Sequence, residues 1–460
     1  IVRVAYDDGV DTIITCDNGI SAIDQIQYAK DLGLTVIVTD HHDVPFIEED
    51  GVRTFLSSQA DAIINPKQIE CEYKFKSICG AGVAFKLMEA LYEEIGMDKE
   101  ECYKLIEFVA IATVCDVVDL IDENRIFVKN GLEMLNNSKN IGINALKKAC
   151  GLEDKEITAY HLGFVIGPCL NASGRLDSAK KGLELLLMED DEEAEKLAQE
   201  IVDLNDARKN MTKEGVDRAI NIIDSTDINN DKILVVYIPD IHESLAGIVA
   251  GRVKEKYNKP TIILTKSEEG VKGSARSIEE YNMFEGLLAC KELLDKFGGH
   301  PMAVGLSLQE DKVDELRKAL NNKCELTDED LTRKIMIDSS LPLEYLNLHL
   351  IEELNVLEPF GKGNSKPVFG VRDAKITKAM LLGKDKNVLK LKLLTNNNIT
   401  IDAMIFNDLE NFESKIIEKY GNEGLDNLYN KSNNNISMDG LIEKDDKTPH
   451  TVIQYFEDGE

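Results

Sequence analysis

The first apolar run of the chain is followed by a turn and an amphipathic stretch. Residues 11–16 (DTIITC) predict a buried strand, and Asp17-Asn18-Gly19 predicts the turn after it. Ser21 is the expected N-cap of a helix through Asp31, which Gly33 closes. The pattern therefore predicts a strand–turn–helix unit.

The same alternation continues through the first 120 residues. Residues 35–39 (TVIVT) and 62–64 predict two more strands, and residues 80–95 and 103–115 predict buried helices. Repeated units of this kind are typical of a parallel, doubly wound sheet.

A charged region rich in Glu, Leu, Lys and Ala, from residue 178 to about 223, predicts long helices that bridge two domains. A second αβ unit follows, with a strand at 232–238, a helix at 245–257 and a strand at 261–265. The fold class is therefore α/β.

The C-terminal part has a different pattern. Residues 321–330 predict a linker, and the tail at 430–447 is rich in Asn and Asp with little pattern. Between them, short strands are expected at 334–337, 367–371, 388–393 and 399–405. This region predicts a small β-rich module.

Composition narrows the functional class. The 460 residues are 43% hydrophobic, which is enough for real cores, and 53 Lys and Arg against 84 Asp and Glu give a net charge of −31. Such a chain is a poor candidate for adhesion to DNA or anionic membrane through its whole surface. Any nucleic acid must bind in a local basic groove.

The nine cysteines form no C-x-x-C pair, and several lie in apolar runs, so we expect a reduced, cytoplasmic protein. We predict no membrane span and, because Arg3, Asp7 and Asp8 are among the first ten residues, no signal peptide. The chain starts at Ile1 rather than Met, in what reads as a βα unit, and we expect a truncated N-terminus.

An acidic residue follows directly after each of two consecutive predicted strands. Asp17 follows the first and Asp40 the second, and His41 and His42 come directly after Asp40. Ligands bind beyond the carboxyl ends of parallel strands, so these side chains are placed to share a metal. Carboxylate oxygen with imidazole nitrogen suits Mn²⁺ better than Mg²⁺ or Zn²⁺. The alternative is that both acids are ordinary turn residues.

Asp116 interrupts the apolar stretch FVAIATVCDVVDL, where an unpaired carboxylate would be costly. We expect a buried acid that binds a metal or joins a hydrogen-bond network. The alternative is an N-cap for the next segment.

Three segments offer groups for phosphate recognition. Residues 168–176 (PCLNASGRL) predict a tight loop with amide, hydroxyl and guanidinium donors, although these residues alone favour an ordinary polar turn over a phosphate site. Residues 272–277 (KGSARS) put Arg276 on a strand, or at a solvated strand end.

The third segment, 297–305 (FGGHPMAVG), follows a predicted helix that ends at Lys296. Gly298 and Gly299 would let an anion approach closely, and His300 adds a donor; a glycine C-cap is the alternative.

Taken in order, these motifs resemble the DHH phosphoesterase superfamily, and most closely its RecJ family of single-strand-DNA-specific exonucleases. The matching motifs are Asp17-Asn18-Gly19, Asp40-His41-His42, Ala112-Thr113-Val114-Cys115-Asp116, Asn171-Ala172-Ser173-Gly174-Arg175, Gly298-Gly299-His300, Glu123-Asn124-Arg125, Gly273-Ser274-Ala275-Arg276-Ser277 and Pro359-Phe360-Gly361-Lys362-Gly363-Asn364. The last introduces a C-terminal OB-type domain that shorter relatives lack. The resemblance extends from Ile1 to about Phe406.

The resemblance implies a domain order. A parallel-sheet DHH domain at 1–177 would precede connecting helices at 178–225, a smaller α/β DHH-associated Gly-Gly-His domain at 226–325, and an OB-like β-barrel for nucleic-acid binding at 331–460.

It also implies a Mn²⁺-dependent 5′-to-3′ exonuclease, with Mg²⁺ as the alternative ion, that hydrolyses single-stranded DNA in recombination and repair. Asp17, His41 and Asp116 would be metal ligands. Asp40 and His42 would be catalytic residues that support the site and contact the scissile phosphate. DNA phosphates in an interdomain cleft would be bound by Asn171, Arg175, Arg276, Gly298, Gly299 and His300. We expect a monomer, with a single-strand-binding protein or a helicase as partner.

Two departures from the family pattern stand out. The family's Asp-x-Asp motif should lie upstream of Ile1 and is absent, so we expect this polypeptide to be weak or inactive and the complete gene product to be active. Cys115 and Cys169 occupy positions where the family commonly has Ala and Arg.

Two other functions stay open. One is a DHH phosphodiesterase of short oligonucleotides or cyclic dinucleotides, against which the C-terminal β-module argues. The other is a non-catalytic DHH scaffold, against which the retained acids and histidines argue.

Overall fold

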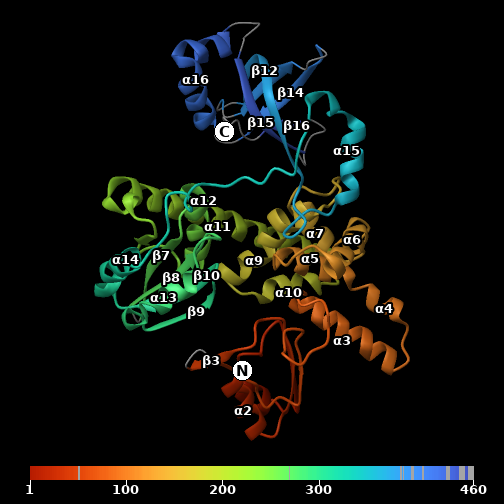
Figure 1. Ribbon diagram of the computed structural model, residues 1–460. Helices are drawn as coiled ribbons and strands as arrows, with labels where there is room; N and C mark the ends of the chain where they lie inside the picture. The colour runs from red at the N-terminus through yellow and green to blue at the C-terminus, as the bar shows by residue number, and fades with distance from the viewer. Residues whose placement is uncertain are drawn as a thin grey trace. The chain divides into compact units, whose positions relative to one another are not determined.

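The structure, a computed structural model, describes residues 1–49, 52–268, 270–383, 386, 388–394, 398–406, 409–430, 436–444 and 451–453. By their contacts they divide into two units (Figure 1). The first unit comprises Ile1–Asn136, Thr158–Tyr160 and Ile335–Glu460. The second comprises Asn137–Ile157 and His161–Lys334.

The first unit begins with a parallel sheet of order β1–β2–β5, as the sequence predicts. β1 (Thr12–Cys16) pairs in register with β2 (Thr35–Thr39), which pairs with β5 (Ala62–Ile64). Apolar side chains of α2 (Ile23–Asp31) pack on Val36 and Val38 of β2. The first and second strands therefore end at the same level of one sheet edge. The remaining elements before Ala62 are α1 (Val2–Asp7), β3 (Phe46–Glu49) and β4 (Val52–Phe55).

Two details of the first unit differ from the prediction. β1 is not buried: Ile13 packs toward α2, but Ile14 points to the opposite face of an edge strand and is 60% exposed. Ser21 is not the N-cap, because the turn closed by Ala22 N–H and Gly19 C=O places Ala22 there.

A helical cluster follows, built around a core that includes Val83, Phe85 and Val109. The predicted helix at 103–115 is two helices, because α4 ends at Tyr103 and α5 begins at Ile106. The helices of this cluster are α3 (Gly80–Glu94), α4 (Lys99–Tyr103), α5 (Ile106–Cys115) and α6 (Asp122–Asn136).

The C-terminal part of the first unit is β-rich, as predicted. Its strands are ordered β11–β12–β13–β14–β16–β15, and β12 also pairs with β15. Alternate residues of β13 are buried, namely Leu389, Leu391 and Leu393. The elements are β11 (Ser339–Ser340), α15 (Leu348–Leu354), β12 (Val368–Leu382), β13 (Val388–Leu394), β14 (Thr400–Ile405), α16 (Leu409–Asn430), β15 (Ile436–Lys444) and β16 (Thr451–Ile453).

The strand expected at 334–337 is absent, because this segment makes no ladder and the short β11 starts at Ser339. In the tail, which showed little pattern, β15 and β16 are formed, while residues 431–435 and 445–450 lie outside the described residues.

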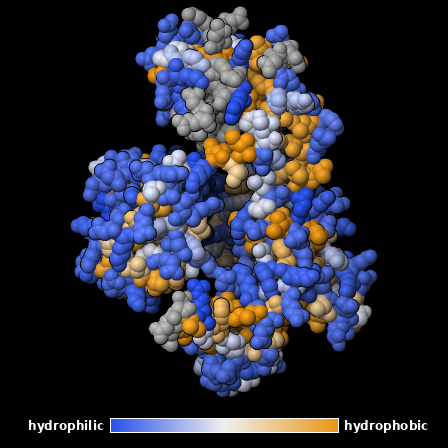
Figure 2. Space-filling model, viewed as in Figure 1, coloured by the Kyte–Doolittle hydropathy of each residue, from blue (hydrophilic) through white to orange (hydrophobic). Residues whose placement is uncertain are grey.

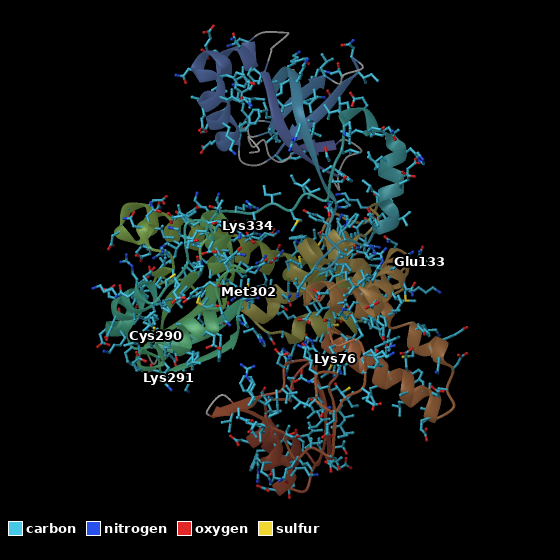
Figure 3. The ribbon with its side chains drawn as sticks, viewed as in Figure 1. Lys76, Glu133, Cys290, Lys291, Met302 and Lys334 are labelled. Atoms are coloured by element: carbon cyan, nitrogen blue, oxygen red, sulfur yellow. The ribbon has the colours of Figure 1, made fainter. Side chains whose placement is uncertain are left out.

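The second unit contains a five-stranded sheet of order β6–β7–β8–β10–β9. β6 and β7 are parallel, and the other pairs are antiparallel. One face of this sheet packs on α11 (Asp191–Ser225) and α12. The other face packs on α13 and α14. Met302, labelled in Figure 3, precedes β10 and accepts a hydrogen bond from the Ser277 amide. The elements are β6 (Leu234–Tyr237), α12 (Ala246–Tyr257), β7 (Thr261–Ser267), β8 (Gly270–Arg276), α13 (Met283–Leu288), β9 (Lys296–His300), β10 (Ala303–Leu308) and α14 (Val313–Asn322).

The helices of the second unit include the long charged helix that the sequence predicts. α11 packs on α7 and α9, and its Ala219 and Ile223 pack against the sheet core. These helices are α7 (Ile141–Ala149), α9 (Gly167–Leu176), α10 (Lys180–Leu186) and α11 (Asp191–Ser225). The short α8 (Ala159–His161) has its first two residues in the first unit and its last in the second.

The visible surface is largely hydrophilic, with hydrophobic residues gathered over α15 and over the N-terminal segment (Figure 2). Leu348 of α15 is 67% exposed. Within the described ranges, no helix combines the length and the apolar character needed to cross a bilayer.

Candidate active site

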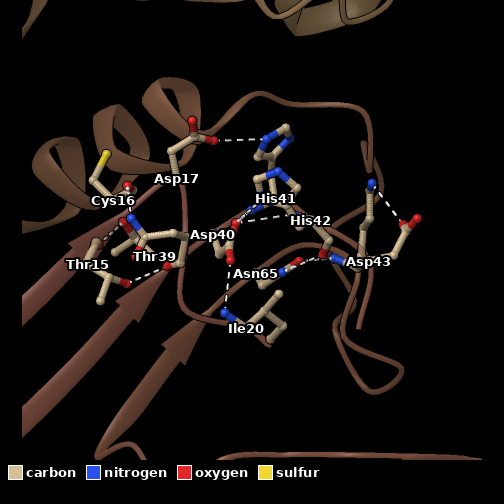
Figure 4. A network of polar contacts seen from close by, with 12 residues as sticks. Thr15, Cys16, Asp17, Ile20, Thr39, Asp40, His41, His42, Asp43 and Asn65 are labelled. Atoms are coloured by element: carbon tan, nitrogen blue, oxygen red, sulfur yellow. Dashed lines mark hydrogen bonds and ion pairs between the residues drawn. The ribbon is translucent and has the colours of Figure 1, made fainter. Parts of the chain in front are cut away.

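The ends of β1 and β2 bring the predicted acids and histidines together (Figure 4). Cys16 lies opposite Thr39 in the ladder, so Asp17 and Asp40 leave the sheet at the same edge. The Asp17 amide donates to the Thr39 carbonyl, and the Asp40 amide to that of Ile64. Asp17 has a φ of 63°, a left-handed conformation in which this acid turns away from the strand direction.

His41 lies between two carboxylates. Its Nε2 atom is 3.0 Å from Oδ1 of Asp17 and 3.5 Å from Oδ2 of Asp116. The residue is 8% exposed, and this nitrogen makes no well-directed hydrogen bond within the described part of the chain. A buried polar atom without a hydrogen bond is costly, which indicates a ligand that the polypeptide does not supply.

The spacing of these atoms fits a shared cation. Ligands at right angles around an ion with bonds of about 2.1 Å lie about 3 Å apart. Asp17, His41 and His42 each offer a ligand atom, and these atoms all lie within 4.8 Å of one another. A carboxylate oxygen together with imidazole nitrogens suits Mn²⁺ and other borderline divalent ions. The residues present therefore fit a metal.

Asp40 has a different role from Asp17. It is 1% exposed and all its contacts are within the protein. Its Oδ2 accepts from the Ile20 amide, and its Oδ1 accepts from the His41 amide at 2.7 Å and from the His42 amide at 3.2 Å. Burial raises the pKa of Asp40, but the hydrogen bonds outweigh burial and hold it below its ordinary value. Asp40 is therefore an anion fixed by backbone amides.

The same carboxylate orients His42. Nδ1 of His42 lies 2.7 Å from Oδ1 of Asp40, and the side chain of Asn65, at the end of β5, donates to the His42 carbonyl at 2.9 Å. A carboxylate at Nδ1 favours the tautomer with a proton on that nitrogen and leaves Nε2 to accept or bind. Asn65 is a supporting residue that the sequence analysis missed.

Asp116 comes from a helix rather than a strand. It is the C-cap of α5, and its side chain is 40% exposed, so the expected burial and the alternative N-cap role are both wrong. The helix ends there and Val117 takes a φ of 57°, which releases the acid from the apolar run. Burial still raises the pKa of Asp116, His41 lowers it and Asp17 raises it further.

Gly80 allows this arrangement and was also missed. It opens α3, and a Cβ atom built on it would lie 2.3 Å from Oδ1 of Asp17. The start of α3 therefore contacts the acid, where the helix dipole favours negative charge.

The second unit holds the predicted phosphate-binding residues. Asn171 and Arg175 lie on α9 rather than in a loop, because Pro168 starts a helix whose Cys169, Ala172 and Ser173 are buried. Gly298, Gly299 and His300 form β9 rather than a helix C-cap, because they pair with β10. Only Gly299 of these glycines has a positive φ, 148°.

Two arginines of this unit converge on residues 242–247. Arg175 donates from Nη1 to the Ser244 carbonyl at 2.8 Å, and Arg276 donates to Ser274 Oγ at 2.9 Å. A Cβ on Gly247 would lie 2.8 Å from Nη2 of Arg276. Burial lowers the pKa of Arg276 and the charge of Arg175 lowers it further. Both guanidinium groups donate to carbonyl or hydroxyl oxygens of the chain and keep their positive charge, so the pair can bind an anion.

His242 and Ser244 join this group and were missed by the sequence analysis. Nδ1 of His242 lies 2.7 Å from Oγ of Ser244, which in turn donates to the Arg175 carbonyl. His300 and Arg276 both lie opposite Ala303 in the ladders, one on each side of β10. Their Cα atoms are therefore about 10 Å apart by strand spacing.

Comparison with known proteins agrees with this layout. Residues 2–113 match the DHH family, N-terminal domain, residues 230–326 match the DHHA1 domain, and residues 337–435 match the RecJ OB domain. The single-stranded-DNA-specific exonuclease RecJ of Bacillus subtilis is 38% identical over 403 residues, 87% of this chain and 49% of that protein. RecJ of Haemophilus influenzae is 34% identical over 426 residues, 88% of this chain and 72% of that protein.

The fold is also that of a solved relative. RecJ from Thermus thermophilus, crystallised with Mn²⁺, superposes with a TM-score of 0.78 at 24% identity, over 100% of this chain and 64% of that protein. The chain thus spans about half the length of the Bacillus relative and about two thirds of the Thermus one.

Proposed function

The chain belongs to the RecJ family, and from this premise we propose that it hydrolyses single-stranded DNA from the 5′ end with a divalent cation, preferably Mn²⁺. The observation that carries the proposal is His41, whose buried Nε2 atom has no hydrogen bond among the described residues and is flanked by two carboxylate oxygens within 3.5 Å. A nitrogen in that position needs a proton from solvent or a cation.

Each residue has a proposed task. Asp17, His41 and Asp116 would hold the cation, and Asp40 would position His42, whose Nε2 atom would contact the scissile phosphate. A divalent ion bound here would supply Lewis-acid activation of water and neutralise charge on the phosphate.

DNA binding would fall to the second unit and the OB domain. Arg175 and Arg276 would bind phosphate oxygens through their guanidinium groups. Asn171, Gly298, Gly299 and His300 are proposed as further phosphate ligands. An anion site of this kind accounts for DNA binding by a chain whose net charge is −31. A monomeric state, a cytoplasmic location and partners such as a single-strand-binding protein or a helicase remain predictions.

The experiment is a nuclease assay with protein in excess over DNA, which detects slow release. The substrate is a 5′-phosphorylated single strand labelled at its 3′ end, tested with Mn²⁺ beside the matching duplex and a dinucleotide. We expect slow shortening of the labelled single strand from its 5′ end, little shortening of the duplex, and loss of shortening in His41→Ala but not in His349→Ala. His349 is an exposed histidine of α15 that pairs with Glu353.

Two other outcomes of this assay would favour the alternative functions. Preferential hydrolysis of the dinucleotide would favour a phosphodiesterase of short oligonucleotides. Absence of both hydrolysis and Mn²⁺ binding would favour a non-catalytic scaffold.

A further inference from the structure

Two cysteine sulfurs meet where α7 and α9 pack on α11. Cys150 is the C-cap of α7 and is partly exposed, whereas Cys169 lies in the first turn of α9 and is 2% exposed. Their Sγ atoms are 3.8 Å apart. Gly151, which follows Cys150, has a φ of 67°, so the chain reverses direction directly after the cysteine.

The surroundings of Cys169 favour a thiolate. The buried side chain of Asn205 donates from Nδ2 to its Sγ at 3.2 Å. Arg208 fixes that amide, because its Nε and Nη2 atoms donate to Asn205 Oδ1 at 3.1 and 2.9 Å. The amide group therefore presents its N–H to the sulfur, and the positive charge lies behind it.

The pKa values of the two thiols therefore shift in opposite directions. The hydrogen bond from Cys150 lowers the pKa of Cys169, burial raises it and the charge of Lys209 lowers it further, with a net decrease. The pKa of Cys150 is raised, first by its hydrogen bond to Cys169 and then by burial. The Asn205 amide and the Arg208 charge behind it give Cys169 the stronger thiolate character of the pair, so Cys169 is the nucleophile.

We propose that Cys150 and Cys169 are a modification site, a thiol pair that hydrogen peroxide oxidises reversibly to a disulfide joining the end of α7 to the start of α9. Sγ of Cys169 attacks one peroxide oxygen, the O–O bond breaks, and hydroxide leaves with the electron pair. Sγ of Cys150 then attacks the resulting sulfenic sulfur and displaces its oxygen as water. Two thiols and one peroxide give one disulfide and two waters; two electrons pass from sulfur to oxygen.

The disulfide assignment stands apart from the proposed nuclease function, but one consequence rests on it. α9 also carries Asn171 and Arg175, and the charge of Arg175 acts on Arg208 beside Cys169. A disulfide would tie the start of α9 to the end of α7 and would fix the helix that carries both residues. We therefore expect oxidation to change the affinity for single-stranded DNA.

The test uses the full chain without substitution. Reduced protein is treated with a small excess of hydrogen peroxide, free thiols are alkylated, and peptides are mapped by mass spectrometry. We expect a peptide pair cross-linked through Cys150 and Cys169 that dithiothreitol separates, while Cys290, which is buried in the sheet core and labelled in Figure 3, stays alkylatable after unfolding.

Variants test the role of the amide. Asn205→Ala should slow formation of the cross-link several-fold, and Cys290→Ser should leave its rate unchanged. Recovery of both Cys150 and Cys169 as alkylated thiols, at a peroxide dose that oxidises exposed Cys16, would overturn the proposal. So would irreversible oxidation of Cys169 without a cross-link. Unchanged DNA affinity after mapped cross-linking would overturn only the proposed effect on DNA.

Discussion

Asp40 and His42 are joined by a contact of 2.7 Å between Oδ1 and Nδ1, and the same carboxylate accepts three backbone amides. We predict that Asp40→Asn weakens Mn²⁺ binding about tenfold, because an amide supplies only one acceptor oxygen and loses the orientation of His42. It should also lower the free energy of unfolding by about 2 kcal/mol, since buried amides lose a partner.

Calorimetry and urea unfolding measure these effects. The control is Asp43→Asn on the same loop, where an exposed acid pairs with Lys67 at 2.9 Å. Equal Mn²⁺ affinity in Asp40→Asn and Asp43→Asn would show that Asp40 does not organise the site.

Gly80 sets the position of Asp17. We predict that Gly80→Ala displaces Asp17 and weakens Mn²⁺ binding, because the new methyl group would lie 2.3 Å from the carboxylate oxygen. Gly251→Ala is the matched control, since Gly251 lies within α12 and a Cβ there has nothing within 4 Å. The control should stabilise the protein by about 1 kcal/mol, as alanine favours helix. Unaltered metal affinity in Gly80→Ala would refute the contact.

Arg125 binds the backbone of the segment that precedes the C-terminal sheet. Its Nη1 and Nη2 atoms donate to the carbonyls of Leu357 and Val356 at 2.7 and 3.0 Å. We predict that Arg125→Ala accelerates hydrogen exchange across residues 356–364 and costs about 1 kcal/mol locally. Arg3→Ala, which removes an exposed pair with Asp7 and a contact with the Tyr6 ring, should change neither. Exchange at 356–364 that stays as slow as in the parent would contradict this role.

An ion-pair cluster in the C-terminal sheet predicts a pH dependence. Lys390 lowers the pKa of Asp402, burial raises it in part and Lys392 lowers it further. The folded pKa therefore lies below the unfolded value of about 3.9. The cluster stabilises the sheet at neutral pH, and the contribution disappears as the pH falls through the folded pKa.

Asp402→Asn should accordingly destabilise β13 and β14 by less than about 1 kcal/mol at pH 7, since the group is partly exposed. Hydrogen exchange at pH 7 and at about pH 3 checks the sign, because the difference in protection between parent and variant should become smaller as the pH falls below the unfolded pKa. A difference in protection between parent and variant that grows on acidification would contradict this pH dependence.

The sequence was sufficient to place Asp17 and Asp40 together, because parallel strands of equal register end at one edge. It could not place Asp116 against His41, since that contact depends on how a helix packs beside the sheet. Asn171 and Arg175 were assigned to a loop because Asn, Ser and Gly favour turns, but burial of one face makes the segment helical.

The helix end predicted before Gly298 and Gly299 is wrong for a related reason. Paired glycines signal a helix end, and the long-range ladder with β10 overrides that local preference. The contact between His242 and Ser244 has only a weak sequence signal, an Ile-His-Glu-Ser turn before an apolar helix.

Titration of the metal-free chain with Mn²⁺ by calorimetry, in parallel with His41→Ala and the control His349→Ala, tests the central claim most directly. The account predicts saturable binding by the parent and by His349→Ala, and at least tenfold weaker binding by His41→Ala. Equal affinity in all three proteins, or no binding by the folded parent, would contradict it.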